Sequence, residues 1–500
     1  MSDPKTPVRV RFAPSPTGRL HIGGGRTALY NYLLAKQTGG QFILRLEDTD
    51  QKRFQEGAEQ EMIDGLRWLG LEWDEGPDVG GPYAPYRQSE RKERYQAYAR
   101  QLIEQGDAFY CFCSSKRLNE AREHQRKHKL PIRYDGACRT LTKEEAQARV
   151  DAGEAHVVRF KMPYTGKTIV TDAVRGKIEI DNAQLDDYIL VKSDGLAVYH
   201  LASMADDHDM KITHVFRGSE WLPTFPLHKR IYDAFGWEEP VWVHLSVFLK
   251  PSGKGKMSKR ESADLAKDNK SIFLTDLADL GYTPEAVVNW IALMGWSYDD
   301  RTEFFTMENL IEKFSIEKLN GSPAAINFTK FDHFNGLHIR ALELDDLAER
   351  MKPYFAAGGI DADDETLKQL APILQTRLKG MDDILPMAGF FFNETVAPFT
   401  ADLLPRKTSA AEAATITQRT LPILESATAF THDELDTPLR ELADELGFKP
   451  GQVFGVLRSS VTGQRVSPPL FETMEIIGKD KVLARIRDAT TQLEMLAAAA

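Results

Sequence analysis

The chain has 500 residues, of which 42% are hydrophobic and 27% charged, and its formal net charge is −11 at pH 7. This composition predicts ample core in roughly three to five units, excludes membrane spans, and argues against indiscriminate nucleic-acid binding without excluding a local basic face. Three cysteines are too few for a disulfide framework, and the N-terminus lacks the apolar run of a secretory signal, so we expect a cytoplasmic protein.

The first predicted element is a strand over residues 8–12 that runs through a turn into a helix. Apolar residues at every second position predict a buried strand, which Pro14 ends. Glycines 23–25 then open a helix, whose uncapped N–H groups and positive dipole end predict an anion site. His21 adds a side chain that can hydrogen-bond to phosphate oxygen. The spacing fits neither common glycine-rich nucleotide motif, and glycines that serve only tight packing remain the alternative.

A second parallel strand is predicted over residues 41–47 and ends in an acidic run. Carboxylates at the carboxyl end of a buried strand lie where open α/β sheets bind ligands, so a functional role is as plausible as simple capping by Asp48 and Asp50. Amphipathic helices are expected over 55–69 and 90–105.

The chain changes character between residues 108 and 190, which we interpret as an inserted subdomain. Short strand-like runs occur at 156–162 and 178–180, and no long amphipathic helix follows Arg126. Residues 116–133 carry seven Lys or Arg against two Glu. This basic stretch indicates either a face that binds a phosphate backbone or a merely solvated helix.

Two further strands are predicted at 214–221, where the strand runs into a helix start, and at 241–249. The second strand is followed by a basic loop that contains glycines, with the cations Lys254, Lys256, Lys259 and Arg260. Such a loop either binds polyphosphate or is a solvated surface loop. From about Asp276 onward the pattern is wholly helical, with helices over 284–294, 307–314, 342–354, 364–378, 409–421, 437–446, 452–462 and 479–493.

Three motifs in this order resemble those of the class I aminoacyl-tRNA synthetases. They are APSPTGRLHIGG at 13–24, RLEDTD at 45–50 and KMSKR at 256–260. Four further segments of the sequence are similar to bacterial-type glutamyl-tRNA synthetases: 81–95, 134–139, 199–202 and 217–228. The similarity covers nearly the whole chain and is weakest beyond about residue 400. Each motif alone is common, but their joint order makes coincidence improbable.

The resemblance implies an α/β plus all-α fold, in which a Rossmann-like parallel-sheet catalytic domain carries an inserted α+β acceptor-binding subdomain and precedes a helical anticodon-binding half. The expected segments are 1–107 and 191–253 for the two halves of the catalytic domain, 108–190 for the insertion, 254–340 for the KMSKR loop and a helical stem-contact domain, and 341–500 for two helical anticodon subdomains that meet near 400.

The implied reaction activates L-glutamate with ATP to glutamyl-adenylate and transfers the glutamyl group to the 3′-terminal adenosine of tRNA-Glu, with Mg²⁺ on the polyphosphate. It needs positioning and charge neutralisation rather than a protein nucleophile. The resemblance assigns catalysis to His21, Lys256, Lys259 and Arg260. It assigns ATP binding to His21, Gly23, Gly24, Glu220, Trp221 and Lys259.

For the amino acid, the resemblance assigns glutamate binding to Arg11, Ser15, Glu47, Tyr199, Ser203 and Arg217. Arg11 and Arg217 would hold carboxylates, because a guanidinium pairs with a carboxylate through two parallel hydrogen bonds, and Glu47 would bind the α-ammonium group. A strand-edge salt bridge is the alternative for Arg11. Ser203 replaces a residue that is often Asn in the family. The family also implies a monomer.

The three cysteines resemble the zinc-binding knuckle that some family members carry in the insertion. Cys111, Cys113 and Cys138 would be ligands. The fourth ligand is often a His two residues after the third Cys, where this chain has Thr140. Tyr134 is the substitute that we assign, with His124 or His128 as alternatives, and inert reduced thiols remain the other interpretation.

In the helical half, Arg377 aligns with a family arginine that contacts the tRNA anticodon, which would let the protein separate tRNA-Glu from tRNA-Gln. Three other functions stay open. A glutaminyl enzyme would need an all-β anticodon module, and a relative that glutamylates a modified tRNA base would stop near residue 300. A nucleotidyltransferase or a binding module on the same nucleotide fold would not require the acidic motif, the basic insertion or the helical tail.

Overall fold

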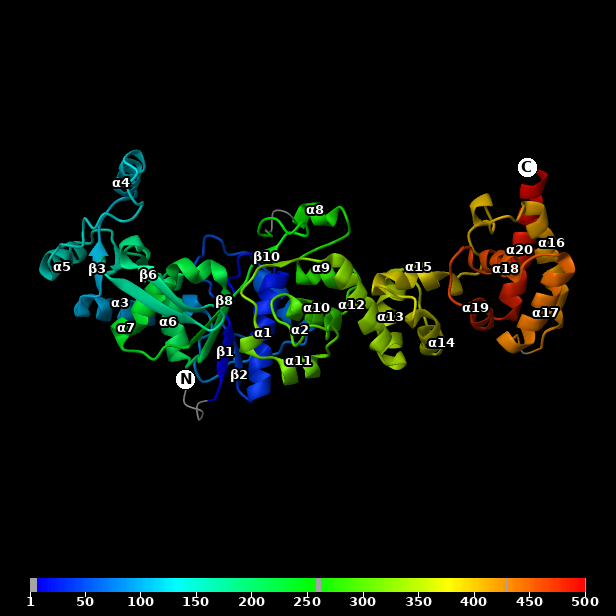
Figure 1. Cartoon of the computed structure of the whole chain (residues 1–500), viewed down its shortest axis with the longest axis horizontal. Coiled ribbons are helices and arrows are strands. Elements are labelled where there is room, and N and C mark those ends of the chain that lie inside the picture. Colours follow the sequence, from blue (N-terminus) through cyan, green and yellow to red (C-terminus); the bar gives the residue numbers. More distant parts are fainter. Residues whose placement is uncertain (1–6, 258–261, 429, 500) are drawn as a thin grey trace. The chain divides into compact units, whose positions relative to one another are not determined.

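The computed structural model describes residues 7–257, 262–428 and 430–499. The chain forms two compact units: Met1–Ala278 with Val287–Phe328, and Asp279–Ala286 with Thr329–Ala500. Figure 1 labels the elements of both. The five-segment division expected from the sequence is finer than these two units and stays a prediction.

A parallel sheet of four strands, in the order β2-β1-β8-β9, forms the centre of the first unit. The strands are β1 (Arg9–Phe12), β2 (Gln41–Leu44), β8 (His214–Gly218) and β9 (Val241–Leu245). Their apolar residues are buried, as expected of a parallel sheet covered on both faces. The predicted parallel α/β class is therefore confirmed, and with it the strands at all four places.

Helices connect and cover these strands in the first unit (Figure 1). They are α1 (Ile22–Thr38), α2 (Ala58–Trp68), α3 (Lys92–Gln105), α6 (Tyr199–Asp209) and α7 (Phe225–Phe235), with short 3₁₀ helices η1 (Gln88–Arg91) and η3 (Ser219–Thr224). The helices predicted from periodicity at 55–69 and 90–105 agree with α2 and α3 within three residues at each end.

The region between residues 108 and 190 has its own small sheets. An antiparallel sheet of order β3-β4-β7 contains β3 (Ala108–Cys111), β4 (Val157–Phe160) and β7 (Ile189–Val191). A separate hairpin pairs β5 (Lys167–Asp172) with β6 (Gly176–Asp181), and the helices are α4 (Ser115–Lys127) and α5 (Lys143–Asp151). The strands β4 and β6 correspond to the runs expected at 156–162 and 178–180, whereas β3, β5 and α5 were not predicted. Helix α5 is nine residues long and begins at a Thr142–Glu145 capping box.

After the sheet, the prediction of wholly helical structure is wrong at one point. The two-residue strand β11 (Ala324–Ala325) pairs in parallel with β10 (Phe248–Leu249). Two residues are too few for a period to show in the sequence. The helices of this stretch are α8 (Ser262–Ala266), α9 (Leu274–Asp279), α10 (Pro284–Leu293) and α11 (Met307–Lys313).

The second unit is helical, as predicted. It contains α12 (Phe328–Ala341), α13 (Leu344–Ala357), α14 (Asp364–Gln375), α15 (Ile384–Ala388), α16 (Ala410–Ser426), α17 (His432–Leu446), α18 (Pro450–Thr462), α19 (Leu470–Ile477) and α20 (Lys479–Ala498). One apolar cluster runs from Ile339 to Leu493. Among the described residues of the chain, every helix is too short or too polar to cross a membrane.

Charged side chains are buried together beside the sheet. Asp207 on α6 accepts from Nε of Arg11 on β1 at 2.8 Å and from Nη1 of Arg45 at 2.8 Å. Its neighbour Asp206 accepts from Nε of Arg91 at 2.6 Å. All five side chains are almost completely buried. We call these residues, with Glu47, the buried ion network; it joins β1, the end of β2 and η1 to α6.

Replacing Asp206 by Ala should destabilise the first unit by about 3–5 kcal/mol, because Arg91 and Arg45 keep their buried charges and lose this carboxylate. Urea unfolding followed by tryptophan fluorescence measures the effect selectively, since all seven tryptophans of the chain lie in the first unit. Asp264→Ala is the matched control, because it removes an exposed carboxylate paired with Lys267 and should leave the unfolding midpoint unchanged. A loss of less than about 1 kcal/mol for Asp206→Ala would contradict a structural role for the network.

Candidate active site

A cleft of about 1230 Å³ lies at the carboxyl ends of the parallel strands of the first unit. Open α/β sheets bind their ligands at this edge. The structure brings most of the predicted site residues to its wall: Arg11, Ser15, His21, Gly23, Gly24, Glu47, Tyr199, Arg217, Glu220, Trp221 and Lys256. They come from β1, the turn after it, α1, the end of β2, α6, β8, η3 and the loop after β10.

One of the predicted cleft residues is not on this wall. Ser203 is completely buried on α6, and its Oγ accepts a hydrogen bond from Nη2 of Arg45 at 3.2 Å. This contact places Ser203 beneath the site, against the buried ion network. Lys259 and Arg260 lie outside the described residues.

His21 caps the N-terminus of α1 and corrects one prediction. Its Nδ1 accepts the backbone N–H groups of Gly23 at 3.0 Å and Gly24 at 3.3 Å, so these first-turn donors are not uncapped. Because Nδ1 is an acceptor, the neutral ring carries its proton on Nε2. A Cβ on Gly23 would lie 2.8 Å from Cε1 of His21, so this glycine makes room for the capping ring. The start of α1 is therefore a capped first turn rather than a row of uncapped N–H groups.

Arg11 and Glu47 lie at the ends of β1 and β2 and belong to the buried ion network. Arg11 is held by Asp207 through both Nε, at 2.8 Å, and Nη2, at 3.2 Å, while its Nη1 donates to the carbonyl of Phe216 at 3.3 Å. Arg11 therefore forms a salt bridge, as the alternative interpretation expected, and its side chain also lines the cleft. Burial raises the pKa of Glu47, against the opposing effect of Arg45 and Arg11.

Arg217, at the end of β8, is paired differently. Its Nε donates to Nε2 of His244 at 2.9 Å, and its Nη1 donates to Oη of Tyr199 at 3.4 Å. Its Nη2 is buried and has no hydrogen-bond partner among the described residues. A buried guanidinium nitrogen without an acceptor is costly, and a ligand carboxylate in the cleft would supply that acceptor.

Aromatic rings and a lysine complete the wall. Tyr199 and Trp221 stack with centroids 3.8 Å apart and planes at 21°. Such a flat surface suits a planar group or an aliphatic stem. Lys256 is exposed at the cleft, in a loop whose ends are joined by the N–H of Met257 donating to the carbonyl of Phe248 at 2.8 Å. A flexible cation at this place can approach a phosphate chain.

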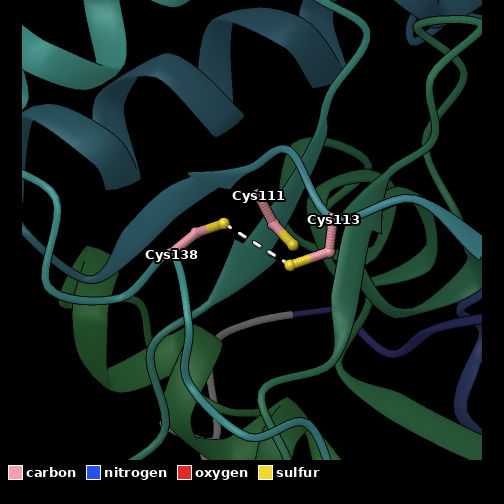
Figure 2. A group of neighbouring side chains, drawn as sticks. All are labelled: Cys111, Cys113 and Cys138. Carbon is pink, nitrogen blue, oxygen red and sulfur yellow. Dashed lines mark hydrogen bonds between the residues drawn. The ribbon is translucent and has the colours of Figure 1, made fainter. Parts of the chain in front are cut away.

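The three cysteines form a cluster beside β3 (Figure 2). The Sγ atoms of Cys113 and Cys138 are 3.6 Å apart, and Oη of Tyr134 lies 3.4 Å from Sγ of Cys111 and 3.5 Å from Sγ of Cys113. Burial opposes ionisation of Cys111, but hydrogen bonds from Tyr134 and from the backbone of Cys113 outweigh it and lower the pKa of Cys111. Burial raises the pKa of Cys113 and that of Tyr134.

This geometry fits a zinc ion in three of four positions. Tetrahedral zinc with Zn–S bonds of about 2.3 Å holds its sulfurs about 3.8 Å apart, close to the separation of Cys113 and Cys138. Two further polar side chains contact the thiols: Tyr134, and Arg117, whose Nη1 donates to Sγ of Cys113 at 3.4 Å. Of these only Tyr134 can act as a metal ligand, because a guanidinium has no lone pair to offer, and His124 and His128 are not part of the cluster. The two histidine rings instead pack on each other on α4, with centroids 4.3 Å apart.

In the second unit, Arg377 is exposed just after α14. Burial, together with the charge of Arg377, lowers the pKa of Arg458 on α18. Nε of Arg458 has no hydrogen-bond partner among the described residues. The second unit therefore carries two neighbouring cations, the arrangement that a polyanion neutralises.

Sequence reasoning missed four residues that support the cleft: Arg45, Asp172, Asp207 and His244. A signal existed for Arg45, because a charged residue directly follows an otherwise apolar run in a strand predicted to be buried, and a buried charge requires a partner. The Asp206–Asp207 pair was visible only as a polar cluster. Its partners are 162 and 196 residues away from Asp207, so no local pattern could identify them.

Comparisons with known proteins agree with this geometry. Residues 7–333 match the family model of tRNA synthetases class I (E and Q), catalytic domain, and residues 346–490 match an anticodon binding domain. A glutamate–tRNA ligase of Dehalococcoides mccartyi is 42% identical over 496 residues, covering 98% of this chain and 99% of the relative. A glutamate–tRNA ligase of Chloroflexus aurantiacus is 43% identical over 511 residues, covering 99% of this chain and 100% of the relative.

A solved structure extends the likeness to three dimensions. The crystal structure of a glutamate tRNA ligase from Elizabethkingia meningosepticum in complex with its amino acid superposes with a TM-score of 0.89 at 36% sequence identity, covering 98% of this chain and 100% of that one. The resemblance inferred from three motifs is thus confirmed over nearly the full length. The chain belongs to the glutamate–tRNA ligase family of the class I tRNA synthetases.

Proposed function

We propose that the cleft activates L-glutamate with ATP and transfers the glutamyl group to the 3′-terminal adenosine of tRNA-Glu. The observation that carries the proposal is the buried Nη2 of Arg217, which has no hydrogen-bond partner among the residues that the structure describes. His21 and the glycine-rich start of α1 line the same cleft. The Arg217 nitrogen suits a carboxylate, and the positive end of the α1 dipole suits a phosphate chain. An amino acid and a nucleotide therefore fit side by side.

In the first step, an oxygen of the α-carboxylate attacks the α-phosphorus of ATP, a P–O bond forms, and pyrophosphate leaves. ATP enters as its magnesium complex, which offsets part of the phosphate charge. Arg217 and Arg11 orient the carboxylates, Glu47 faces the α-ammonium group, and Tyr199 and Ser15 complete the pocket. His21 donates from Nε2 to phosphate oxygen, with Gly23, Gly24, Glu220 and Trp221 around the adenosine, and Lys256, Lys259 and Arg260 neutralise the leaving pyrophosphate.

In the second step, a hydroxyl of the terminal ribose attacks the carbonyl carbon of the adenylate, and AMP leaves. This step requires the acceptor end of the tRNA at the cleft. The exposed cations of α4 and the loop after it support a role of the insertion in holding the acceptor stem; they are Arg122, Arg126, Lys127 and Lys129. We further propose that the protein acts as a cytoplasmic monomer.

ATP–pyrophosphate exchange tests this function. We expect exchange with glutamate that appears only when tRNA is present, and none with glutamine, because an amide would leave the Arg217 charge unneutralised. His21→Ala should slow the exchange about a hundredfold, since one preorganised donor to the phosphates is lost. This variant also shows that the exchange arises in this cleft rather than in a contaminating host enzyme. Absence of exchange under all conditions would refute the proposed activity.

We also propose a structural zinc ion held by Cys111, Cys113, Cys138 and Tyr134. The three thiol groups converge within 4.8 Å, and the Tyr134 oxygen lies against two of them. Such an ion would fix the loop between β3 and α4 to the loop that carries Cys138. The weak member is Tyr134, because burial raises the pKa of its phenol and so disfavours the phenolate that a metal would need.

Protein purified without chelator should contain about one equivalent of zinc by elemental analysis. Cys113→Ser should lose the metal, because a serine hydroxyl is a much poorer ligand than a thiolate. Tyr134→Phe separates two arrangements: loss of zinc supports ligation by the phenol, and full retention removes Tyr134 from the ligand set. Less than about a tenth of an equivalent in the unmodified protein would overturn the site.

For the anticodon, we propose contact with Arg377. The residue is exposed, and its neighbour Arg458 adds positive charge that the described side chains do not neutralise. Arg377→Gln should change the ratio of charging of tRNA-Glu to tRNA-Gln by about tenfold or more, the effect of one lost charge-assisted hydrogen bond. Lys368→Gln removes an exposed cation from the preceding helix, α14, and should leave the ratio unchanged. Equal ratios for both variants would remove the role of Arg377.

A further inference from the structure

His244, at the fourth position of β9, connects the buried Asp172 to Arg217 through two hydrogen bonds. Its Nδ1 lies 2.8 Å from Oδ2 of Asp172, and its Nε2 accepts from Nε of Arg217 at 2.9 Å. Asp172 and His244 are completely buried, and neither lines the cleft. The chain Asp172–His244–Arg217 therefore approaches the site from behind.

Asp172 is rigidly held. Its Oδ2 also accepts the backbone N–H of His244 at 2.9 Å, and its Oδ1 accepts the backbone N–H groups of Val174 at 3.1 Å and Arg175 at 2.9 Å. Arg175 in turn donates to the carbonyl of His244. Every contact of the carboxylate is with a donor, so Asp172 accepts the proton-bearing Nδ1 of His244 and fixes its tautomer.

The fixed tautomer decides how Arg217 is presented. Burial lowers the pKa of His244 to about 4, so the ring is neutral near pH 7 with its proton on Nδ1 and a lone pair on Nε2. That lone pair receives Nε of Arg217. With Nε occupied, the guanidinium can offer a bidentate ligand only its Nη1–Nη2 edge, where Nη2 has no partner among the described residues.

We propose that Asp172 and His244 are positioning residues that orient Arg217 for the substrate carboxylate. The inference rests on the proposed role of Arg217 in glutamate binding. It also assigns a function to the β5–β6 hairpin: this hairpin lies within the insertion in sequence, and its Asp172 contacts His244 on strand β9 of the parallel sheet. Without the acceptor at Nε2, the guanidinium would keep its Nη1 hydrogen bond to Tyr199 but would lose part of its preorganisation.

Kinetics of glutamate activation in the full-length protein, in the presence of tRNA, tests the inference. His244→Leu removes the acceptor, whereas His244→Gln places a carbonyl oxygen near the position of Nε2; both lose the ring nitrogen that faces Asp172. We expect KM for glutamate to rise about tenfold or more in His244→Leu and to stay within about threefold in His244→Gln. In both variants kcat and KM for ATP should remain within about threefold, a split that general destabilisation would not produce.

The variant Asp172→Asn provides a second test if His244→Leu does not fold. The new amide can donate to Nδ1 and force the proton of His244 onto Nε2, where it opposes Nε of Arg217, so KM for glutamate should again rise about tenfold. Glu75→Gln is the matched control: it changes another buried carboxylate, one that pairs with Arg9 away from the cleft, and should leave KM for glutamate unchanged.

Arg217→Gln separates failure of this inference from failure of the proposed function. If the unmodified protein shows no glutamate-dependent exchange, the function itself is refuted. If Arg217→Gln leaves KM for glutamate unchanged, the role of Arg217 is refuted. If Arg217→Gln raises KM while His244→Leu and Asp172→Asn do not, or if His244→Gln and His244→Leu behave alike, Asp172 and His244 are structural only.

Discussion

The bidentate pairing of Arg11 with Asp207 is the interaction on which the catalytic unit most depends. It joins the first strand of the sheet to α6 across 196 residues of sequence. Arg45 shares Asp207, and Arg91 binds the neighbouring Asp206, so three buried arginines face Asp206, Asp207 and Glu47. Each of these charges would cost several kcal/mol to bury alone, and their mutual pairing offsets this desolvation cost.

The buried ion network also explains why the site has its charge pattern. Because Asp207 neutralises Arg11, this arginine of the cleft already has a carboxylate partner. Glu47 is tied to Arg45 in the same way, at 3.2 Å. Arg217 is the exception, since its partners are a neutral histidine and a tyrosine hydroxyl. Among the described residues Arg217 has no carboxylate partner, so its charge is available to a ligand.

Much of the fold could be predicted from the sequence because its signals are local. The alternation of Val8, Val10 and Phe12 and the apolar run before Arg45 indicate strands at once. The short elements β11 and α5 were missed since few residues carry their pattern. The cleft was predicted through motifs, whereas its support was not: the partners of Arg11, Arg45 and Arg217 lie far away in sequence. His21 shows a subtler limit, because its ring turns inward to cap the helix that it begins.

In the proposed binding mode, the charge of Arg217 gives a physical reason for choosing glutamate over glutamine. Glutamate carries two carboxylates and one ammonium group, so it enters with one net negative charge. In that mode the side-chain carboxylate would neutralise Arg217 and supply an acceptor to Nη2, which has no hydrogen-bond partner among the described residues. Glutamine matches the same shape, but its amide leaves the guanidinium charge buried without a counterion. Discrimination then follows from the cost of an unpaired charge, and that cost is largest when Asp172 and His244 prevent the guanidinium from turning away toward solvent.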